Sequence, residues 1–520
     1  MFYDNKIWIG YSEGEKVCIE PKMANRHGLI AGATGTGKTI TLKVLAESFS
    51  DAGVPVFLAD IKGDLSGMVR PGIDSEDMQK RIAKFGLAEC GFNYQSYPAT
   101  FWDIYKNMGV PARTTISEMG PMLLSKLMDL NDTQSDILTI VFKIADDQNL
   151  LLIDTKDLKA LLQYVGDHNE ELALEYGNIA KQSVAAILRS VVALEAQGGE
   201  DFFGEPALNL SDWFMPAAGG KGTINILDCR QLVNDTTMYS TFLLWLMSEL
   251  FETLPEVGDM DKPRMVFFFD EAHLLFDDIS KALMSKIEQV VKLIRSKGVG
   301  IYFITQSPKD IPNDVLAQLG NKVQHALRAY TPTEEKAVKA VANSFRANPD
   351  FDTFEVLTSL GTGEALISTL DEKGVPSVVK QCKVLPPQSM MGPITDEEKK
   401  KEILMNNLYL KYNNEEDRDS AFEFFQRMAK EEALAVQAEA EQEAAEKKAL
   451  SDEKKQKKEE EKRQLELSAA QMRVAKSAAG TIGRELGNAI GKSIGGSFGK
   501  KVGGNVGASL ARNILGTFLK

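Results

Sequence analysis

The sequence has few of the residues that build metal centres or disulfide frameworks. Its four cysteines, Cys18, Cys90, Cys229 and Cys382, lie far apart and form no CxxC pair. This spacing argues against a zinc finger, an iron–sulfur cluster and a disulfide-stapled scaffold. The chain also contains only four histidines, so a metal centre built from histidine is not expected. We therefore expect a protein of a reducing compartment.

Long apolar runs and a leader peptide are missing as well. No run of about 18 uninterrupted apolar residues occurs, so no ordinary membrane-spanning helix is expected. The first residues, MFYDNKIWIGYSEGEKV, show no basic segment followed by an apolar one, which argues against a signal peptide. The hydrophobic fraction of 43% and the charged fraction of 26% exclude wholesale disorder. We expect a cytoplasmic multidomain protein, and peripheral association with a membrane stays open.

Positive charge is scarce except at the C-terminal end. The net charge is −14, and residues 473–520 hold eight Lys or Arg and one acid, Glu485, so this segment carries +7. The remaining 472 residues therefore carry −21. An acidic body argues against a protein that coats DNA with its whole surface, although it allows a local basic channel. For the basic end, an anionic membrane, nucleic acid and the acidic body itself are open as partners.

Apolar strands alternate with helical patterns in two parts of the chain. Residues 29–70 are typical of a βαβ unit, with a glycine-rich loop between the first strand and the helix. From about residue 222 the alternation resumes with INILD, TFLLWLMSELFETL, RMVFFFD, KIEQVVKLIRSKG and GIYFITQ. Strands that alternate with helices predict an α/β fold with a mostly parallel sheet covered on both faces.

Changes in composition divide the chain into five regions. The predicted core consists of 1–70, which holds N-terminal strands and the βαβ unit, and of 206–394. Between them, 71–205 has helical spacing and is predicted to be an inserted, mostly α-helical subdomain. Residues 395–472 are rich in Glu, Lys, Ala and Gln and predict a charged helical arm, for which a coiled coil and a solvated or partly disordered arm both remain open. Residues 473–520 form a basic glycine-repeat tail.

The tail has an internal repeat of four residues. An apolar residue followed by glycine recurs at 482–483, 486–487, 490–491, 494–495, 498–499, 502–503 and 506–507. Each glycine costs an isolated helix about 1 kcal/mol relative to alanine. Such a stripe is understandable where another helix packs closely or a membrane lies against it. A partner helix, a membrane and a flexible tail remain open.

The clearest chemical motif is GATGTGKT, Gly32–Thr39, which fits G-x-x-x-x-G-K-[ST] at every fixed position. It follows an apolar strand and opens an amphipathic helix, the context in which backbone N–H groups converge on a phosphate. We expect Lys38 to bridge β- and γ-phosphate oxygens and the Thr39 hydroxyl to bind Mg²⁺. The residues predicted to bind the nucleotide are Gly32, Thr34, Gly35, Thr36, Gly37, Lys38, Thr39 and Ile40.

A second motif, RMVFFFDEAH, ends an apolar strand with two adjacent carboxylates. The carboxyl edge of a parallel sheet is where ligands bind. We expect Asp270 to hold Mg²⁺ through water and Glu271 to polarise the attacking water. Together with the loop, this pair predicts hydrolysis of a nucleoside triphosphate. The DEAH helicase class shares these letters, but its other motifs are absent, so we expect His273 to make local contacts.

Further polar residues follow predicted strands of the core. Gln306 ends GIYFITQ and is predicted to sense the γ-phosphate or the water, with an ordinary strand-end residue as the alternative. Asp60 ends VFLAD, and Lys62 and Asp64 are candidates for the same edge.

Two arginines are candidates for stabilising transition-state charge. Arg295 lies near the end of the helix before the Gln306 strand, and Arg328 ends KVQHALRA. Either could act within its own chain or across a subunit boundary, and a surface ion pair is the alternative for each.

The loop after RHGLIAG, the strand-end DEAH, IRSKGVGIYFITQSP and NKVQHALR together resemble the HerA–FtsK superfamily of ring ATPases, in particular bacterial HerA-like proteins of the YjgR type. The segments QSVAAILRSVVALEAQGG and FFGEPAL and the glycine-rich C-terminus are similar to that group too. The resemblance covers roughly residues 5–393, and the tail more loosely. It implies a RecA-like P-loop NTPase core that uses ATP and Mg²⁺.

The resemblance also implies roles for residues and partners. The family's phosphate-binding lysine falls on Lys38, its Mg²⁺ hydroxyl on Thr39, its acidic pair on Asp270 and Glu271, its sensor glutamine on Gln306 and its arginine on Arg295. Family members form hexameric rings, and some pump double-stranded DNA. Only about 25 residues precede the loop here, too few for the β-barrel with which archaeal HerA docks a nuclease, so a nuclease partner is not expected.

Three functions therefore remain open from the sequence. The first is a homo-oligomeric ATPase motor acting on double-stranded DNA. The second is an assembly ATPase bound to a membrane or a protein through residues 473–520. The third is a nucleotide-dependent switch without translocation.

Overall fold

The computed structural model describes residues 1–258, 260–276 and 281–475. The predicted glycine repeat lies outside these residues. The chain divides into a first compact unit, Met1–Ala429, and a second that begins at Lys430. In the described part of the chain, no helix combines the length and the hydropathy that a membrane crossing requires.

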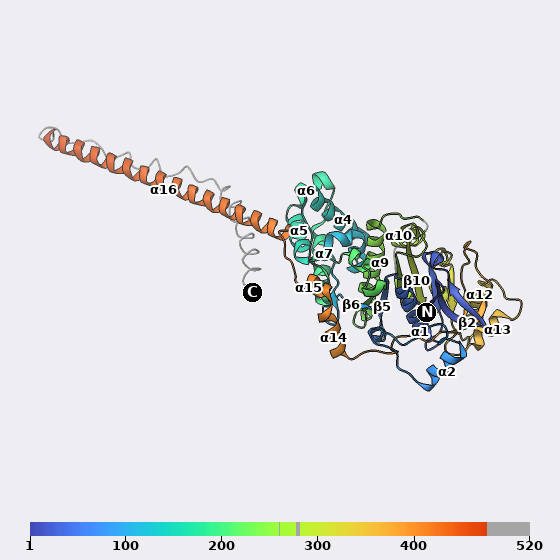
Figure 1. The fold of residues 1–520 in the computed structure, drawn as a ribbon. Helices are drawn as coiled ribbons and strands as arrows, with labels where there is room; N and C mark the ends of the chain where they lie inside the picture. Colours follow the sequence, from blue (N-terminus) through green and yellow to red (C-terminus); the bar gives the residue numbers. More distant parts are fainter. Residues whose placement is uncertain (259, 277–280, 476–520) are drawn as a thin grey trace. The chain divides into compact units, whose positions relative to one another are not determined.

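One large sheet forms the centre of the first unit (Figure 1). Its parallel strands stand in the order β11, β4, β10, β9, β5, β8, β6 and β7. Their bounds are β4 (Gly28–Ala31), β5 (Val56–Asp60), β6 (Ala99–Asp103), β7 (Val110–Pro111), β8 (Ile224–Asp228), β9 (Met265–Phe269), β10 (Val299–Thr305) and β11 (Asn321–Gln324). Because these strands are parallel, the carboxyl ends of β4, β10 and β9 meet at one edge of the sheet.

Antiparallel strands continue the sheet beyond β11. The order there is β12, β13, β2 and β1, and β3 pairs with β2. Their bounds are β1 (Phe2–Tyr3), β2 (Lys6–Ser12), β3 (Glu15–Ile19), β12 (Glu364–Ser368) and β13 (Lys380–Val384). The N-terminal strands therefore pair with the last strand of the core, although more than 360 residues separate them.

Helices cover both faces of the sheet, as the fully apolar strands predict. Phe49 of α1 (Lys38–Asp51) packs on Phe268 and Tyr302, which lie side by side on β9 and β10. The alternate residue Phe267 contacts Trp213, whose ring lies on the opposite face. The other helices of the core are α9 (Thr236–Thr253), α10 (Lys281–Leu293), α11 (Asn313–Leu316), α12 (Pro332–Asn343) and α13 (Thr353–Ser359). The predicted α/β class is confirmed.

The segment between β5 and β8 is largely helical, with one difference from the prediction. Its helices are α2 (Glu76–Lys84), α3 (Ile116–Leu127), α4 (Asp132–Asp147), α5 (Thr155–Asp167), α6 (Asn169–Tyr176), α7 (Lys181–Leu194) and α8 (Glu200–Phe202). Figure 1 shows α4 to α7 gathered beside the β6 end of the sheet. The segment also supplies β6 and β7, which extend the main sheet. The short run ATFWD becomes a strand because β8 offers it a partner, a contact that local periodicity does not reveal.

The core continues past residue 394, where the composition predicted a charged arm. Helices α14 (Asp396–Met405) and α15 (Asn407–Asn413) belong to the first unit. Lys399 of α14 is buried, and its Nζ donates to Oδ2 of Asp228 at 2.6 Å. The structure therefore moves the end of the compact unit to Ala429.

The last described helix is α16 (Ala421–Ala475). At its start, Asp157 of α5 accepts hydrogen bonds from the Ser420 hydroxyl at 2.6 Å and the Phe422 N–H at 2.8 Å. The side chains described from Glu431 to Lys457 are exposed, which agrees with a charged helix without a buried stripe.

Candidate nucleotide-binding site

The phosphate loop joins β4 to α1 and depends on glycine. Gly32, Gly35 and Gly37 have φ values of 152°, 78° and 116°, which glycine adopts without strain. A Cβ on Gly32 would lie 2.5 Å from Cβ of His325, and one on Gly37 would lie 3.2 Å from N of Gly363. Since α1 begins at Lys38, the loop ends at a helix N-terminus, which favours an anion.

Lys38 lies across the mouth of this loop. Its Nζ donates to the carbonyls of Gly32 at 2.6 Å and Ala33 at 3.2 Å. Burial lowers the pKa of Lys38, while the nearby Asp270 and Glu271 act in the opposite direction. The structure therefore brings Lys38 and the acidic pair into one site, although 230 residues separate them in the sequence.

Asp270 directly follows β9, which is separated from β4 by β10 alone. Burial and the adjacent Glu271 raise the pKa of Asp270 to about 6, and Lys62 and Lys38 oppose this shift. Asp270 and Glu271 are half-buried, adjacent carboxylates, and a divalent cation bound beside them would relieve their mutual repulsion.

Glu271 has a left-handed backbone, φ 46° and ψ 48°, which is uncommon outside glycine. Its Oε2 is buried and accepts no hydrogen bond, although Nδ1 of His273 lies 3.3 Å away. Such strain and an unpaired buried oxygen are typical of functional sites, where a further ligand supplies the missing partner. His273 makes the local contact that we expected of it.

The donor set fits a magnesium–triphosphate. The loop and Lys38 supply donors for phosphate oxygens, and the hydroxyl of Thr39 together with Asp270 supplies hard oxygen ligands. Of the other predicted residues, Thr34 and Gly35 are exposed, and Thr36 and Ile40 are half-buried. Gln306 is exposed and directly follows β10, between the loop strand β4 and the acidic strand β9. All of these residues lie at the same edge of the sheet.

The structure places the two candidate arginines differently with respect to this arrangement. Arg295 is exposed and precedes the amino end of β10, whereas the loop follows the carboxyl end of β4, so Arg295 does not reach the loop of its own chain. Arg328 follows β11 and donates to the carbonyls of Thr358 and Leu360, at 3.0 Å for the latter. These carbonyls end α13, where a cation stabilises the helix.

Sequence reasoning missed residues that hold the site in place. Tyr239 of α9 is buried, and its hydroxyl donates to the carbonyl of Asp270 at 2.6 Å. Nε2 of the buried His325 lies 2.9 Å from Oγ1 of Thr41, and its Nδ1 lies 2.9 Å from the carbonyl of Glu364. His325 thus connects the first turn of α1 with β12. His325 lies in the NKVQHALR segment, but no local pattern marks its role, and no local pattern marks Tyr239.

Asp60 is the last residue of β5, and Lys62 follows it at the same edge. The Asp60 carboxylate accepts hydrogen bonds from the N–H groups of Gly63 at 2.8 Å and Leu65 at 3.1 Å. Burial, followed by the nearby Asp64, raises the pKa of Asp60 to about 7. Asp60 therefore shapes the turn that carries Lys62 toward Asp270.

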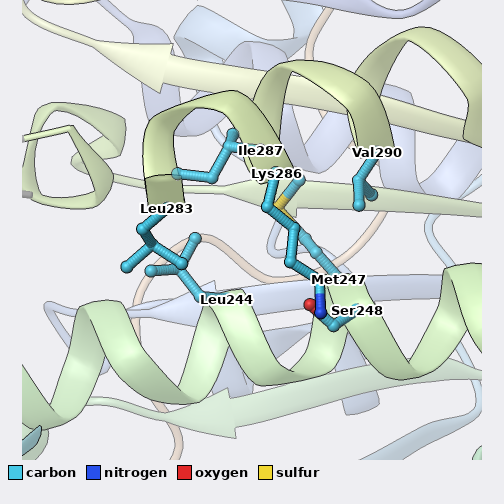
Figure 2. A pocket seen from close by; sticks show the side chains of 7 residues that line it. All are labelled: Leu244, Met247, Ser248, Leu283, Lys286, Ile287 and Val290. Carbon is cyan, nitrogen blue, oxygen red and sulfur yellow. The ribbon is translucent and has the colours of Figure 1, made fainter. Parts of the chain in front are cut away.

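A small cavity elsewhere in the unit does not suit a nucleotide. Figure 2 shows it between α9 and α10, lined by Leu244, Met247, Ser248, Leu283, Lys286, Ile287 and Val290. Its volume of about 10 Å³ has room for about one water molecule. It is a gap in the packing between two helices.

Comparisons with known proteins agree with this geometry. The DNA double-strand break repair helicase HerA of Sulfolobus acidocaldarius is 22% identical over 368 residues, which cover 69% of this chain and 65% of that protein. Its namesake from Sulfurisphaera tokodaii is 22% identical over 381 residues, 71% of this chain and 67% of that protein. This chain thus spans less than two thirds of the first relative's length.

A solved structure of the plasmid coupling protein TrwB with the non-hydrolysable GTP analogue GDPNP superposes with a TM-score of 0.50 at 12% identity. The match covers 73% of this chain and 90% of that one, and it shows a shared fold. The family model described as helicase HerA-like C-terminal matches residues 7–503. The predicted kinship is confirmed, and the chain belongs to the helicase HerA-like C-terminal family.

Proposed function

We propose that this protein is an ATPase that binds ATP with Mg²⁺ and hydrolyses the terminal phosphoanhydride. The observation that carries the proposal is the meeting of Lys38 with Asp270 and Glu271 at one edge of the sheet. The family membership supports it. The TrwB structure, which shares the fold, holds a nucleoside triphosphate analogue, GDPNP.

The residues of the chain divide the work of hydrolysis. Backbone N–H groups of the loop bind the phosphates, and Lys38 exchanges its two carbonyl partners for phosphate oxygens. Thr39 and Asp270 would hold Mg²⁺, which neutralises charge on the β- and γ-phosphates when it is bound. Oε2 of Glu271 orients the attacking water and accepts its proton. Gln306 holds that water or the γ-phosphate from the neighbouring strand.

An ATPase assay with variants tests this division. Lys38→Ala loses nucleotide binding or hydrolysis, because the phosphate charge loses its main partner. Glu271→Gln keeps ATP binding and loses turnover, since an amide cannot take the proton of the attacking water. Lys22→Ala, which changes an exposed lysine far from the loop, keeps wild-type rates. Retained turnover in Glu271→Gln would show that another group is the base.

We further propose that the substrate is double-stranded DNA and that the protein works as a homo-oligomeric ring. We expect this ring to have six subunits. The relatives from Sulfolobus acidocaldarius and Sulfurisphaera tokodaii are DNA double-strand break repair helicases by name. Arg295 does not reach the loop of its own chain, which favours a role at the loop of a neighbouring subunit. ATPase rates with and without duplex DNA at several salt concentrations test the substrate. A stimulation that falls steeply with salt supports the motor.

The charge distribution favours a second candidate, an assembly ATPase anchored at a membrane or a protein by residues 473–520. This segment carries +7 against −21 in the rest of the chain. Binding to anionic liposomes that disappears when 473–520 is deleted, with basal ATPase activity retained, supports the anchor. No effect of DNA or liposomes, together with ATP-dependent binding of a protein, supports a nucleotide-dependent switch.

A further inference from the structure

Helix α2 lies beside the first turn of α1. Ile82 of α2 and Phe85, which follows it, pack in one apolar cluster with Ile40, the residue directly after Thr39 of the phosphate loop. Phe85 is 5% exposed, so this contact is part of the core and fixes the position of α2. The segment that carries α2 thus places its side chains next to the C-terminal end of the loop.

Gly363 joins the loop to this helix. Its N–H donates to the carbonyl of Thr36 at 3.0 Å. A methyl group placed on Gly363 would lie 3.4 Å from both Nη1 and Nη2 of Arg81. The guanidinium therefore lies against a glycine that itself contacts Thr36 and Gly37. Because Gly363 has no side chain, Arg81 can approach the loop closely.

Cationic side chains outnumber carboxylates at this place. Within the parts of the chain that the structure describes, neither Arg81 nor Lys84 forms an ion pair, and the nearby Lys383 has Glu364 at 3.7 Å. Lys383 lowers the pKa of Lys84, which shows that the two ammonium groups lie close together. Three cationic side chains thus share the carboxylate of Glu364, and a bound anion would neutralise the positive charge that remains.

The sheet order gives the direction in which a bound triphosphate extends. Its γ end faces Asp270 at the end of β9, and the strands run β9, β10, β4, β11 and β12 across the sheet. With the γ-phosphate at Asp270, the other end of the phosphate chain would point away from β9, toward β12. Gly363, directly before β12, lies on that side.

We propose that Arg81 binds the α-phosphate of the nucleotide within its own chain, and that Lys84 and Lys383 extend this cationic edge. The inference rests on the proposed ATPase function and deepens it. Arg81 offers two parallel N–H donors to phosphate oxygens, whereas the lysines act as point charges. The site then has two parts, in which Lys38 neutralises the β- and γ-phosphates and Arg81 the α-phosphate.

Isothermal titration of the full chain with three probes tests the proposal: Mg²⁺–ATP, Mg²⁺–ADP and Mg²⁺–tripolyphosphate. Arg81→Ala is expected to weaken all three by about tenfold or more, because each probe places a phosphate at this position when anchored in the loop. Arg81→Lys is expected to recover part of the affinity. The matched control is Lys80→Ala on the same helix, because Lys80 is exposed and pairs with Glu76 at 3.9 Å and Asp77 at 3.8 Å.

Each other outcome is decisive. Wild-type affinity of Arg81→Ala for all probes overturns the inference. Loss with ATP and tripolyphosphate but not with ADP would place Arg81 at the γ-phosphate. Loss with both nucleotides but not with tripolyphosphate would place it at the nucleoside. Both results contradict the inference. Unfolding of Arg81→Ala is excluded by an unchanged melting temperature, and Arg81→Gln provides a second neutral variant. If the wild-type chain binds none of the probes, the proposed ATPase function itself fails.

Discussion

The buried ion pair between Lys399 and Asp228 predicts a measurable asymmetry in stability. The two side chains are 5% and 6% exposed, and their charged atoms lie 2.6 Å apart. Asp228 has a second cation, because Nη2 of Arg230 donates to it at 2.7 Å. Lys399 has no second ion pair among the described residues. Removing Asp228 therefore leaves a buried ammonium without its partner, whereas removing Lys399 leaves Asp228 with Arg230.

The magnitudes follow from this difference. Removing one member of a buried ion pair costs about 3–5 kcal/mol when the remaining charge has no other partner. We therefore expect Asp228→Asn to lower the free energy of unfolding by about 3–5 kcal/mol. We expect about 1.5–3 kcal/mol for Lys399→Met, since one hydrogen bond to a charged group is lost and the carboxylate stays paired. The double variant is expected to cost less than the sum, because neither charge is then left alone.

Urea unfolding followed by tryptophan fluorescence measures these values. All four tryptophans, Trp8, Trp102, Trp213 and Trp245, are buried in the first unit, so the signal reports on that unit. The control is Lys447→Met, whose exposed pair with Glu443 should contribute nothing measurable. If Lys399→Met is as mild as this control, residues 395–413 do not fold with the core, and the boundary at 394 inferred from composition is right. A larger cost for Lys399→Met than for Asp228→Asn would refute the asymmetry.

Three other predictions concern the sheet and the site. Burial lowers the pKa of His27 to about 4, so the unfolded chain binds a proton at this histidine at higher pH than the folded chain does. We therefore expect the free energy of unfolding to fall by about 2 kcal/mol between pH 6.5 and pH 5. Urea titrations at both pH values measure this fall in the wild type, and His27→Asn should lack it. Tyr239→Phe removes the donor to the Asp270 carbonyl, and we expect slower ATP turnover with unchanged ATP affinity; equal turnover would mean that the bond does not position the carboxylates. Gly37→Ala meets Gly363 and should lose nucleotide binding in calorimetry, whereas Gly35→Ala, with open space around it, should keep more of it.

Local sequence decided the elements whose information is local. The phosphate loop needs glycines and a lysine at fixed spacing, and short apolar runs such as MVFFF that alternate with helical patterns are typical of buried parallel strands. The strand-end carboxylates Asp270 and Glu271 follow from the same logic, because parallel strands deliver their carboxyl ends to one edge. These patterns were sufficient for the α/β class, for the family resemblance and for the residues of the candidate site.

Tertiary structure decided what depends on contacts between distant segments. Neither the hydrogen bond from Tyr239 to the Asp270 carbonyl nor the burial of Lys399 against Asp228 leaves a periodic trace in the sequence. Composition predicted a solvated arm for residues 395–429, since most of their side chains are polar. In the structure, the buried Lys399 and its partner Asp228 help to hold this segment on the core. The position of Arg295 at the amino end of β10 follows from strand order, and that of Arg81 follows from the contact of α2 with Gly363. The sequence contains neither.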